Sequence, residues 1–138
     1  MTALAKYETL KYLGKGSYGS ALLVCLKQDR EQKYVMKEIV IGHLKTSEQE
    51  SALKESEFLQ TMAHSNIVSY IESFQDRHKL FIVMEYADGG DLTQAISRRS
   101  KARSHWTEEE AMRIFVQICL ALSHIHAKNV LHRCRIAP

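Results

Sequence analysis

The chain of 138 residues holds only one proline, six glycines and three cysteines. So little proline and glycine excludes collagen-like repeats. A hydrophobic share of 45% with 25% charged residues argues against intrinsic disorder and against a coiled-coil rod. The length suits one domain of common size or a piece of a larger one. We therefore expect a globular domain, or part of one.

Long hydrophobic runs are also missing. Uninterrupted apolar stretches such as Phe81–Met84 span a few residues, whereas a membrane helix needs about 18 or more. The first residues, Met1–Glu8, have no basic segment followed by an apolar one, so they do not resemble a signal peptide. These absences predict a cytoplasmic or nuclear protein without a membrane partner.

Cysteines are few and scattered, which predicts free thiols in a reducing compartment. Potential zinc ligands crowd the C-terminal part of the chain: Cys119, His124, His126, His132 and Cys134. On a helix, however, Cys119 and His126 share one side while His124 points away, and no CxxC or HxxxH spacing is present. We expect no metal site.

The net charge of +3 is too small to predict a nucleic-acid partner. The most basic segment, Ser97–Ser104, has no interleaved aromatic residue on which a base could stack. Binding of an acidic partner and phosphorylation are alternatives for this segment. A solvated surface loop is the favoured interpretation.

Hydrophobic periodicity and turn residues predict an α+β fold with a five-stranded antiparallel sheet. The expected strands are Tyr7–Leu13, Ala21–Leu26, Tyr34–Val40, Ile67–Ser73 and Leu80–Tyr86, with a hairpin at Gln75–His78. A helix is expected from Ser47, boxed with Glu50, to about Met62. A short helix, Asp91–Ser97, a basic loop, Arg98–His105, and a long helix from Thr107, boxed with Glu110, to Lys128 follow. The long helix has an apolar stripe of Ile114, Phe115, Ile118, Leu122 and Ile125.

Gly14, Gly16 and Gly19 form a G-x-G-x-x-G pattern between the first two strands. A strand follows the glycines instead of a helix, which disfavours a dinucleotide-binding fold. Glycines between antiparallel strands can form a flap whose backbone N–H groups approach phosphate oxygens. A plain glycine-rich hairpin is the alternative.

Lys37 follows on the third strand, where alternation places it on the same face as Val35. In the first helix the apolar positions Ala52, Phe58, Leu59 and Met62 define an arc, and Glu55 falls at its centre. A carboxylate on a buried face is costly unless it meets a cation. We therefore predict that Glu55 pairs with Lys37.

These features, together with Ile82–Leu92 and His132–Arg133, resemble the N-terminal half of a eukaryotic protein kinase. The resemblance extends from Tyr7 to Arg133, and the stretches around Phe81–Leu92 and Phe115–Arg133 most resemble the NIMA-related serine/threonine kinases. It implies a kinase N-lobe in residues 1–86, with one regulatory helix. Residues 87–138 would then form the hinge and the first helices of an incomplete C-lobe, ending at a broken His-Arg-Asp motif.

The resemblance also implies ATP as a ligand and a protein as the substrate. The three glycines would cover the phosphates, and Lys37, paired with Glu55, would bind the α and β phosphates. The remaining implied nucleotide contacts are Leu13 and Ala21 around adenine, Met84 at the back wall, the backbones of Glu85 and Ala87 at the adenine edge, and Asp91 near the ribose.

Two residues depart from the family pattern, one in the nucleotide site and one at the catalytic base. Ala21 replaces the usual valine, which should weaken nucleotide binding by about 1 kcal/mol. Cys134 stands where the family has the catalytic Asp, and a thiol does not replace that base. The sequence also stops before the Asn and the Asp-Phe-Gly segment that hold Mg²⁺, so we expect no phosphotransfer by these 138 residues.

Three interpretations follow. The chain is part of a serine/threonine kinase whose catalytic half lies outside this sequence, or a non-catalytic half-domain that binds nucleotide or partners and competes with the full kinase, or a truncated product without function. The apolar stripe of the 107–128 helix would be exposed and is a possible partner surface. Nucleus, centrosome or cilium are locations that only the resemblance suggests.

Overall fold

The computed structural model describes residues 2–16 and 19–130, which form two compact units. The first unit comprises the chain up to Ala63 together with Val68–Tyr86. The second comprises His64–Ile67 and the chain from Ala87 onward. Within the part of the chain described, no helix is both long and apolar enough to span a bilayer.

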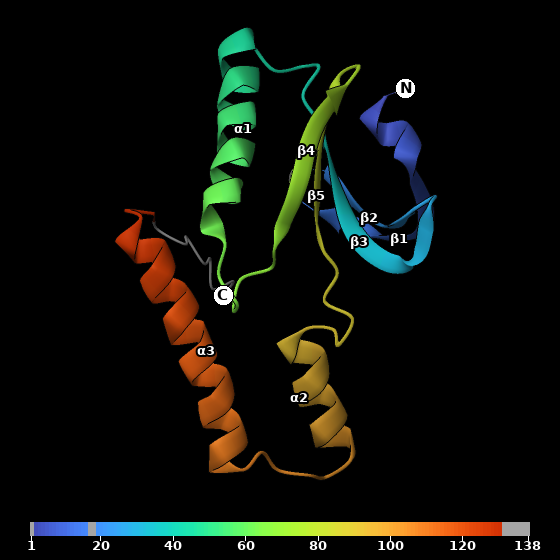
Figure 1. Cartoon of the computed structure of the whole chain (residues 1–138). Coiled ribbons are helices and arrows are strands. Elements are labelled where there is room, and N and C mark those ends of the chain that lie inside the picture. Colours follow the sequence, from blue (N-terminus) through green and yellow to red (C-terminus); the bar gives the residue numbers. More distant parts are fainter. Residues whose placement is uncertain (1, 17–18, 131–138) are drawn as a thin grey trace. The chain divides into compact units, whose positions relative to one another are not determined.

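The first unit is a five-stranded antiparallel sheet with one long helix (Figure 1). Its strand order is β1-β2-β3-β5-β4, and every neighbouring pair is antiparallel, which confirms the predicted α+β fold. Its elements are η1 (Ala3–Lys6), β1 (Tyr7–Gly16), β2 (Gly19–Leu26), β3 (Asp29–Val40), α1 (Thr46–Leu59), η2 (Gln60–Met62), β4 (Tyr70–Asp76) and β5 (Lys79–Glu85).

One face of the sheet carries an aromatic-rich core. Because side chains alternate along a strand, Tyr34 and Met36 of β3 lie on this face beside Phe81 and Val83 of β5. Tyr7 stacks on Phe74, and Phe74 in turn stacks on Phe81 at 5.3 Å between ring centroids. Such contacts add to the stabilisation from burial.

The other face of the sheet packs against α1. Ile41, Leu80 and Ile82 form its buried cluster, and Ala52 and Leu53 of α1 pack against them. Burial of an aliphatic side chain of this size contributes about 1.5–3 kcal/mol. The sheet is thus covered by a helix on the face that carries the odd-numbered residues of β3.

The start of α1 differs from the prediction. The helix begins at Thr46 with Lys45 as its N-cap, and the Lys45 backbone N–H donates to the Glu48 carboxylate at 2.9 Å. The predicted capping pair of Ser47 and Glu50 is therefore wrong. At the other end, η2 continues the helical path to Met62, as the periodicity predicts.

The fourth strand also differs from the prediction. It starts at Tyr70 instead of Ile67, because the His64–Ile67 segment belongs to the second unit. There the His64 ring lies 5.0 Å from the His124 ring, and the Ile67 N–H donates to the His64 carbonyl. At its other end β4 extends to Asp76, past the predicted Ser73, so the turn to β5 comprises only Arg77 and His78.

The second unit contains α2 (Leu92–Lys101) and α3 (Glu108–Ala127). Asp91 caps α2 and Thr107 caps α3, where Thr107 and Glu110 form the predicted capping box. The predicted loop from Arg98 is wrong in its first half, since α2 continues to Lys101. The extension is stabilised by Arg99, which stacks on Trp106 and pairs with Glu110.

Candidate functional site

The glycine hairpin joins β1 to β2. Gly16 pairs with Gly19 in register, and residues 17–18 between them lie outside the described part of the chain. Gly19 has φ +153°, and a Cβ built on it would lie 1.8 Å from the Glu38 carbonyl oxygen. A side chain is therefore excluded at this position, where β2 approaches the β3 backbone.

Lys37 lies at the centre of a row of residues that crosses the sheet. Gly14 of β1 pairs with Ala21 of β2, Ala21 with Lys37, and Lys37 with Ile82 of β5. Residues directly opposite each other in antiparallel strands share one face. The sheet register thus places Gly14, Ala21 and Lys37 side by side in one row across the three strands.

α1 packs over the continuation of this row. Ile82 belongs to the cluster on which Ala52 and Leu53 pack, and its partner Ser73 lies with its hydroxyl oxygen 3.2 Å from that of Ser56. Position 55 is therefore on a turn of α1 that neighbours the lysine row. The side chain of Glu55 lies outside the described part, so the Lys37–Glu55 pair stays a prediction.

The buried face of α1 is centred differently from the predicted apolar arc. Ala52 and Met62 lie inward, but Phe58 and Leu59 are 38% and 37% exposed. Among the described side chains of α1, Ser56 is the most deeply buried, at 1% exposure. The predicted arc therefore holds for Ala52 and Met62 and is wrong for Phe58 and Leu59.

A chain of hydroxyl groups links α1 to β4, and the sequence analysis missed it. The Ser56 hydroxyl donates to the Leu53 carbonyl at 2.7 Å, and the Tyr70 hydroxyl donates to Ser73 at 2.7 Å. Gln60 donates to the Tyr70 hydroxyl at 3.2 Å. The sequence signal for this contact is the spacing of three residues between Leu53 and Ser56, which places both on the same face of a helix.

The end of β5 carries the predicted back wall and hinge. Met84 is half-buried, and on β5 it lies two residues beyond Ile82, which places both on the face of Lys37. The Glu85 backbone N–H donates to the Ser69 carbonyl, and the Ser69 N–H donates to the Glu85 carboxylate. The hydrogen bond that the carboxylate accepts from the Ser69 backbone N–H lowers the pKa of Glu85. A ligand that meets the Glu85 backbone would therefore have to use its carbonyl group.

The remaining predicted nucleotide residues are divided between the units. Leu13 in β1 is 42% exposed and adjoins Gly14. Ala87 and Asp91 belong to the second unit. There the Asp91 carboxylate accepts the Gln94 N–H at 2.7 Å as the N-cap of α2. One oxygen of Asp91 is thus already engaged.

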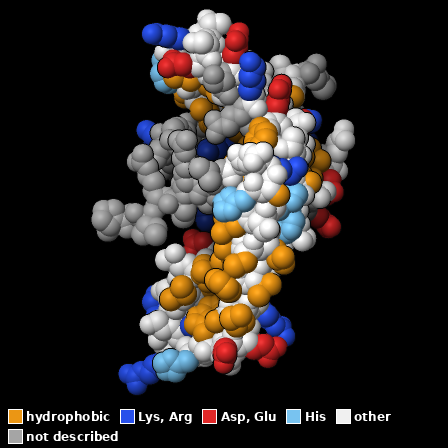
Figure 2. Space-filling view, turned by 90° about the vertical axis from the view of Figure 1, so that its left-hand side faces the viewer, with side chains coloured by type: hydrophobic (Ala, Val, Ile, Leu, Met, Phe, Trp, Pro, Cys, Tyr) orange, Lys and Arg blue, Asp and Glu red, His pale blue; other side chains and the backbone are white. Residues whose placement is uncertain are grey.

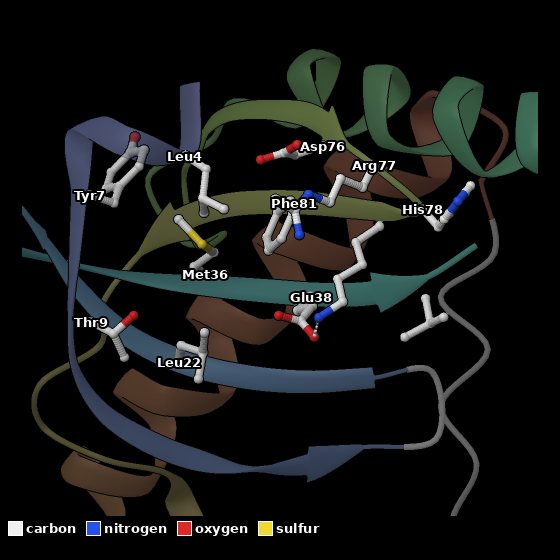
Figure 3. A pocket seen from close by; sticks show the side chains of 12 residues that line it. Leu4, Tyr7, Thr9, Leu22, Met36, Glu38, Asp76, Arg77, His78 and Phe81 are labelled. Carbon is white, nitrogen blue, oxygen red and sulfur yellow. Dashed lines mark hydrogen bonds and ion pairs between the residues drawn. The ribbon is translucent and has the colours of Figure 1, made fainter. Parts of the chain in front are cut away.

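A cavity of about 590 Å³ lies on the opposite face of the sheet from Lys37 (Figure 3). Met36 and Phe81 are part of its apolar lining, and the Glu38 carboxylate pairs with the Lys79 ammonium at 2.8 Å beside it. Because even-numbered residues of β3 face this cavity, it is separated by the sheet from the lysine row. It is therefore not the predicted nucleotide site.

Metal ligands are not gathered in the described residues. Within that part of the chain, no group of three or more His, Cys, Asp or Glu side chains could hold a metal ion. Cys25 is a buried free thiol and Cys119 an exposed one. His132 and Cys134 lie outside the described residues.

The fold and the motif residues define the class of this protein. Residues 7–134 match the family described as "Protein kinase domain", and the chain belongs to that family. Its relatives include serine/threonine-protein kinase Nek1 of Mus musculus at 42% identity, Nek5 of Homo sapiens at 42% and Nek3 of Mus musculus at 44%. The alignments cover 94%, 93% and 92% of this chain. The predicted resemblance to NIMA-related kinases is confirmed.

The chain spans only a part of these relatives. It covers 11% of the length of Nek1, 18% of Nek5 and 24% of Nek3. Activity, substrates and partners of a whole kinase are therefore matters for proposal.

Proposed function

We propose that the chain is the ATP-binding portion of a serine/threonine protein kinase, with residues 1–86 as the N-lobe and residues 87–138 as the hinge and a partial C-lobe. One observation carries the proposal: the register that aligns Gly14, Ala21 and Lys37 on the face covered by α1. A glycine hairpin and a strand lysine on one sheet face are the parts that kinases use to hold ATP phosphates.

In this proposal the backbone of Gly14, Gly16 and Gly19 covers the phosphates, and the Lys37 ammonium contacts the α and β phosphates. Glu55 orients the ammonium by an ion pair. The exclusion of a Cβ at Gly19 fits a hairpin in which backbone comes close to its neighbours. Glu38, which faces away from Lys37 on β3, takes no part.

The adenine and ribose contacts are assigned from the family resemblance. Leu13 and Ala21 line the base from the sheet, Met84 closes the back, and the backbones of Glu85 and Ala87 meet the adenine edge. Asp91 lies near the ribose, using the carboxylate oxygen that does not cap α2. The half-burial of Met84 beside the lysine row supports this part of the assignment.

We propose further that the 138 residues do not transfer phosphate. Cys134 occupies the position of the base that accepts the proton of the substrate hydroxyl, and a thiol lacks the paired oxygens that orient that hydroxyl. The sequence contains no Asp-Phe-Gly segment. The usual Mg²⁺ ligands are therefore not among these residues, and no step is assigned to the metal.

Nucleotide binding is tested by thermal unfolding of the chain with millimolar ATP. We expect ATP to raise the melting temperature, since a ligand that binds only the folded state stabilises it. The increase should be lost in Lys37→Ala and reduced in Glu55→Gln. It should be kept in Lys33→Ala, an exposed lysine on the same strand. No shift in the unmodified chain would contradict nucleotide binding.

Phosphotransfer is tested with radiolabelled ATP and casein as the acceptor. We expect no incorporation above background into casein or into the chain itself. Incorporation that survives repurification and disappears in Lys37→Ala would overturn the role assigned to Cys134.

A non-catalytic binding half-domain is the second candidate, favoured by the surface of α3. Hydrophobic side chains gather along this helix in Figure 2, and Met112, Phe115, Val116, Ile118 and Leu120 are all exposed. No residue of α3 is buried. An apolar surface of this kind is typical of an interaction site.

A further inference from the structure

The corner between α2 and α3 is a solvent-exposed cationic surface whose first half is helical, where the sequence analysis favoured a loop. Residues 98–105 include four Arg or Lys residues and one His, and no Asp or Glu. Arg98, Arg99 and Lys101 lie in the last turn of α2. Arg103 follows with a positive φ of 51°.

Arg99 holds this corner in place. Its guanidinium carbon lies 4.6 Å from the centre of the Trp106 ring, and it pairs with Glu110 and donates to the His105 carbonyl at 3.1 Å. The Ser104 N–H donates to the Arg99 carbonyl at 3.0 Å. The neighbouring side chains are therefore presented from an ordered backbone.

Two adjoining hollows open at the corner. One, of about 490 Å³, is lined by Ser100, Arg103, Ser104 and His105, together with Arg99. The other, of about 510 Å³, adds Arg98 and shares Arg99 and Ser104. Neither lining contains a carboxylate. The first turn of α3 carries three acids. Glu110 is paired with Arg99 and Glu109 with Arg113 at 2.6 Å, and Glu108 lines neither hollow.

We propose that this corner binds a phosphorylated serine or threonine in a partner peptide. A phosphate monoester presents three acceptor oxygens, which suit two guanidinium groups and two hydroxyl donors. Arginine clusters recognise phosphorylated peptides in this way. Arg103 and Arg98, which form no ion pair in the described structure, supply the uncompensated charge.

A nucleic acid suits the corner less well. Single-stranded bases stack on open aromatic faces. Of the two aromatic rings in these linings, Trp106 lies under the Arg99 guanidinium, which leaves the small imidazole of His105. The apolar residues Ala95, Ile96 and Ala102 beside the cations suit the side chains that flank a phosphoserine.

The test uses the ¹⁵N-labelled 138-residue chain and a blocked pentapeptide of four alanines around a central phosphoserine. We expect saturable amide shifts confined to residues 95–106, and none with the unphosphorylated peptide. Arg103→Gln and Arg98→Gln should each weaken binding about fivefold or more, since each removes a charged hydrogen-bond donor. Arg113→Gln, an exposed arginine outside both hollows, should bind like the unmodified chain, and so should Lys37→Ala.

Shifts that do not saturate, or that spread over the cationic residues of both units, would overturn the proposal. An equal loss of binding in Arg113→Gln would also overturn it, and so would tighter binding of a single-stranded oligonucleotide with the same shifts. Loss of binding in Lys37→Ala would assign the peptide phosphate to the proposed nucleotide site instead.

Discussion

The hydroxyl group of Tyr7 donates a hydrogen bond to the carboxylate of Glu72. Tyr7 begins β1 and Glu72 lies in β4, so the bond joins the two edge strands of the sheet. Lys6 completes the cluster with an ion pair of 2.7 Å to the same carboxylate. Burial, followed by the bond to Glu72, raises the pKa of Tyr7. Lys6 and Tyr7 thus connect the beginning of β1 to β4 on the face that carries the aromatic core.

We predict that Tyr7→Phe lowers the free energy of unfolding by about 1–2 kcal/mol, because it removes a part-buried hydrogen bond to a charged group. Urea unfolding would measure the change. Tyr12→Phe is the matched control, because Tyr12 lies on the same strand and is 56% exposed. Its free energy of unfolding should change little. Equal stability of Tyr7→Phe and the unmodified chain would show that the tether does not stabilise the sheet.

The hydroxyl contact between Ser56 and Ser73 should couple α1 to β4. We predict that Ser56→Ala and Ser73→Ala each destabilise the chain, and that the double variant loses less than the sum. The expected coupling is about 0.5–1 kcal/mol, as for residues that share a hydrogen-bond network. A double-mutant cycle from denaturant unfolding measures it. Strict additivity would mean that the two hydroxyls act independently.

Gly19→Ala should be strongly destabilising. A methyl group there would meet the Glu38 carbonyl oxygen at 1.8 Å, and the loss should exceed about 1 kcal/mol because the native backbone is also unsuited to alanine. Gly89→Ala, where a Cβ would meet nothing within 4 Å, is the control. Thermal melts of both variants measure the change in stability. A similar loss of stability in both would show that the close approach at Gly19 does not exclude a side chain.

Glu110 should contribute a pH-dependent part of stability. The hydrogen bond from Arg99, followed by the backbone bond from Thr107, lowers the pKa of Glu110 from 4.5 to about 2. The stabilisation is therefore complete above pH 4.5 and is lost as the pH falls towards 2. Melts from pH 6 to pH 2.5 should show the unmodified chain and Glu110→Gln converging at low pH. A constant difference would contradict the lowered pKa.

The exposed face of α3 should make the purified chain self-associate. Phe115 is 57% exposed and Val116 is 47% exposed, and clustered apolar surface drives association. Light scattering of Phe115→Glu should show a smaller average mass than the unmodified chain. Val68→Glu changes an exposed apolar residue outside α3 and should leave the average mass unchanged. If the unmodified chain is a monodisperse monomer with a sharp melt, the predicted self-association through α3 is wrong.

Much of the fold could be predicted because its signals are local. The alternation around Lys37 and the turn residues at Gly14–Gly19 predicted the sheet, and Thr107 with Glu110 predicted the start of α3. The positions that failed depend on remote contacts. α2 runs past Ser97 because Arg99 stacks on Trp106, and β4 starts late because His64 packs on His124.

The amino-acid sequence by itself determined the family, the order of strands and helices, and the motif positions from Gly14 to Lys37, since these follow from residue type and spacing along the chain. Only the tertiary structure decided that Tyr7 reaches Glu72, that Ser56 meets Ser73, and that the basic segment after Ser97 becomes an ordered corner. The physical reason is that hydrogen bonds and cation–ring contacts depend on atoms brought within a few ångströms by packing, which periodicity does not encode.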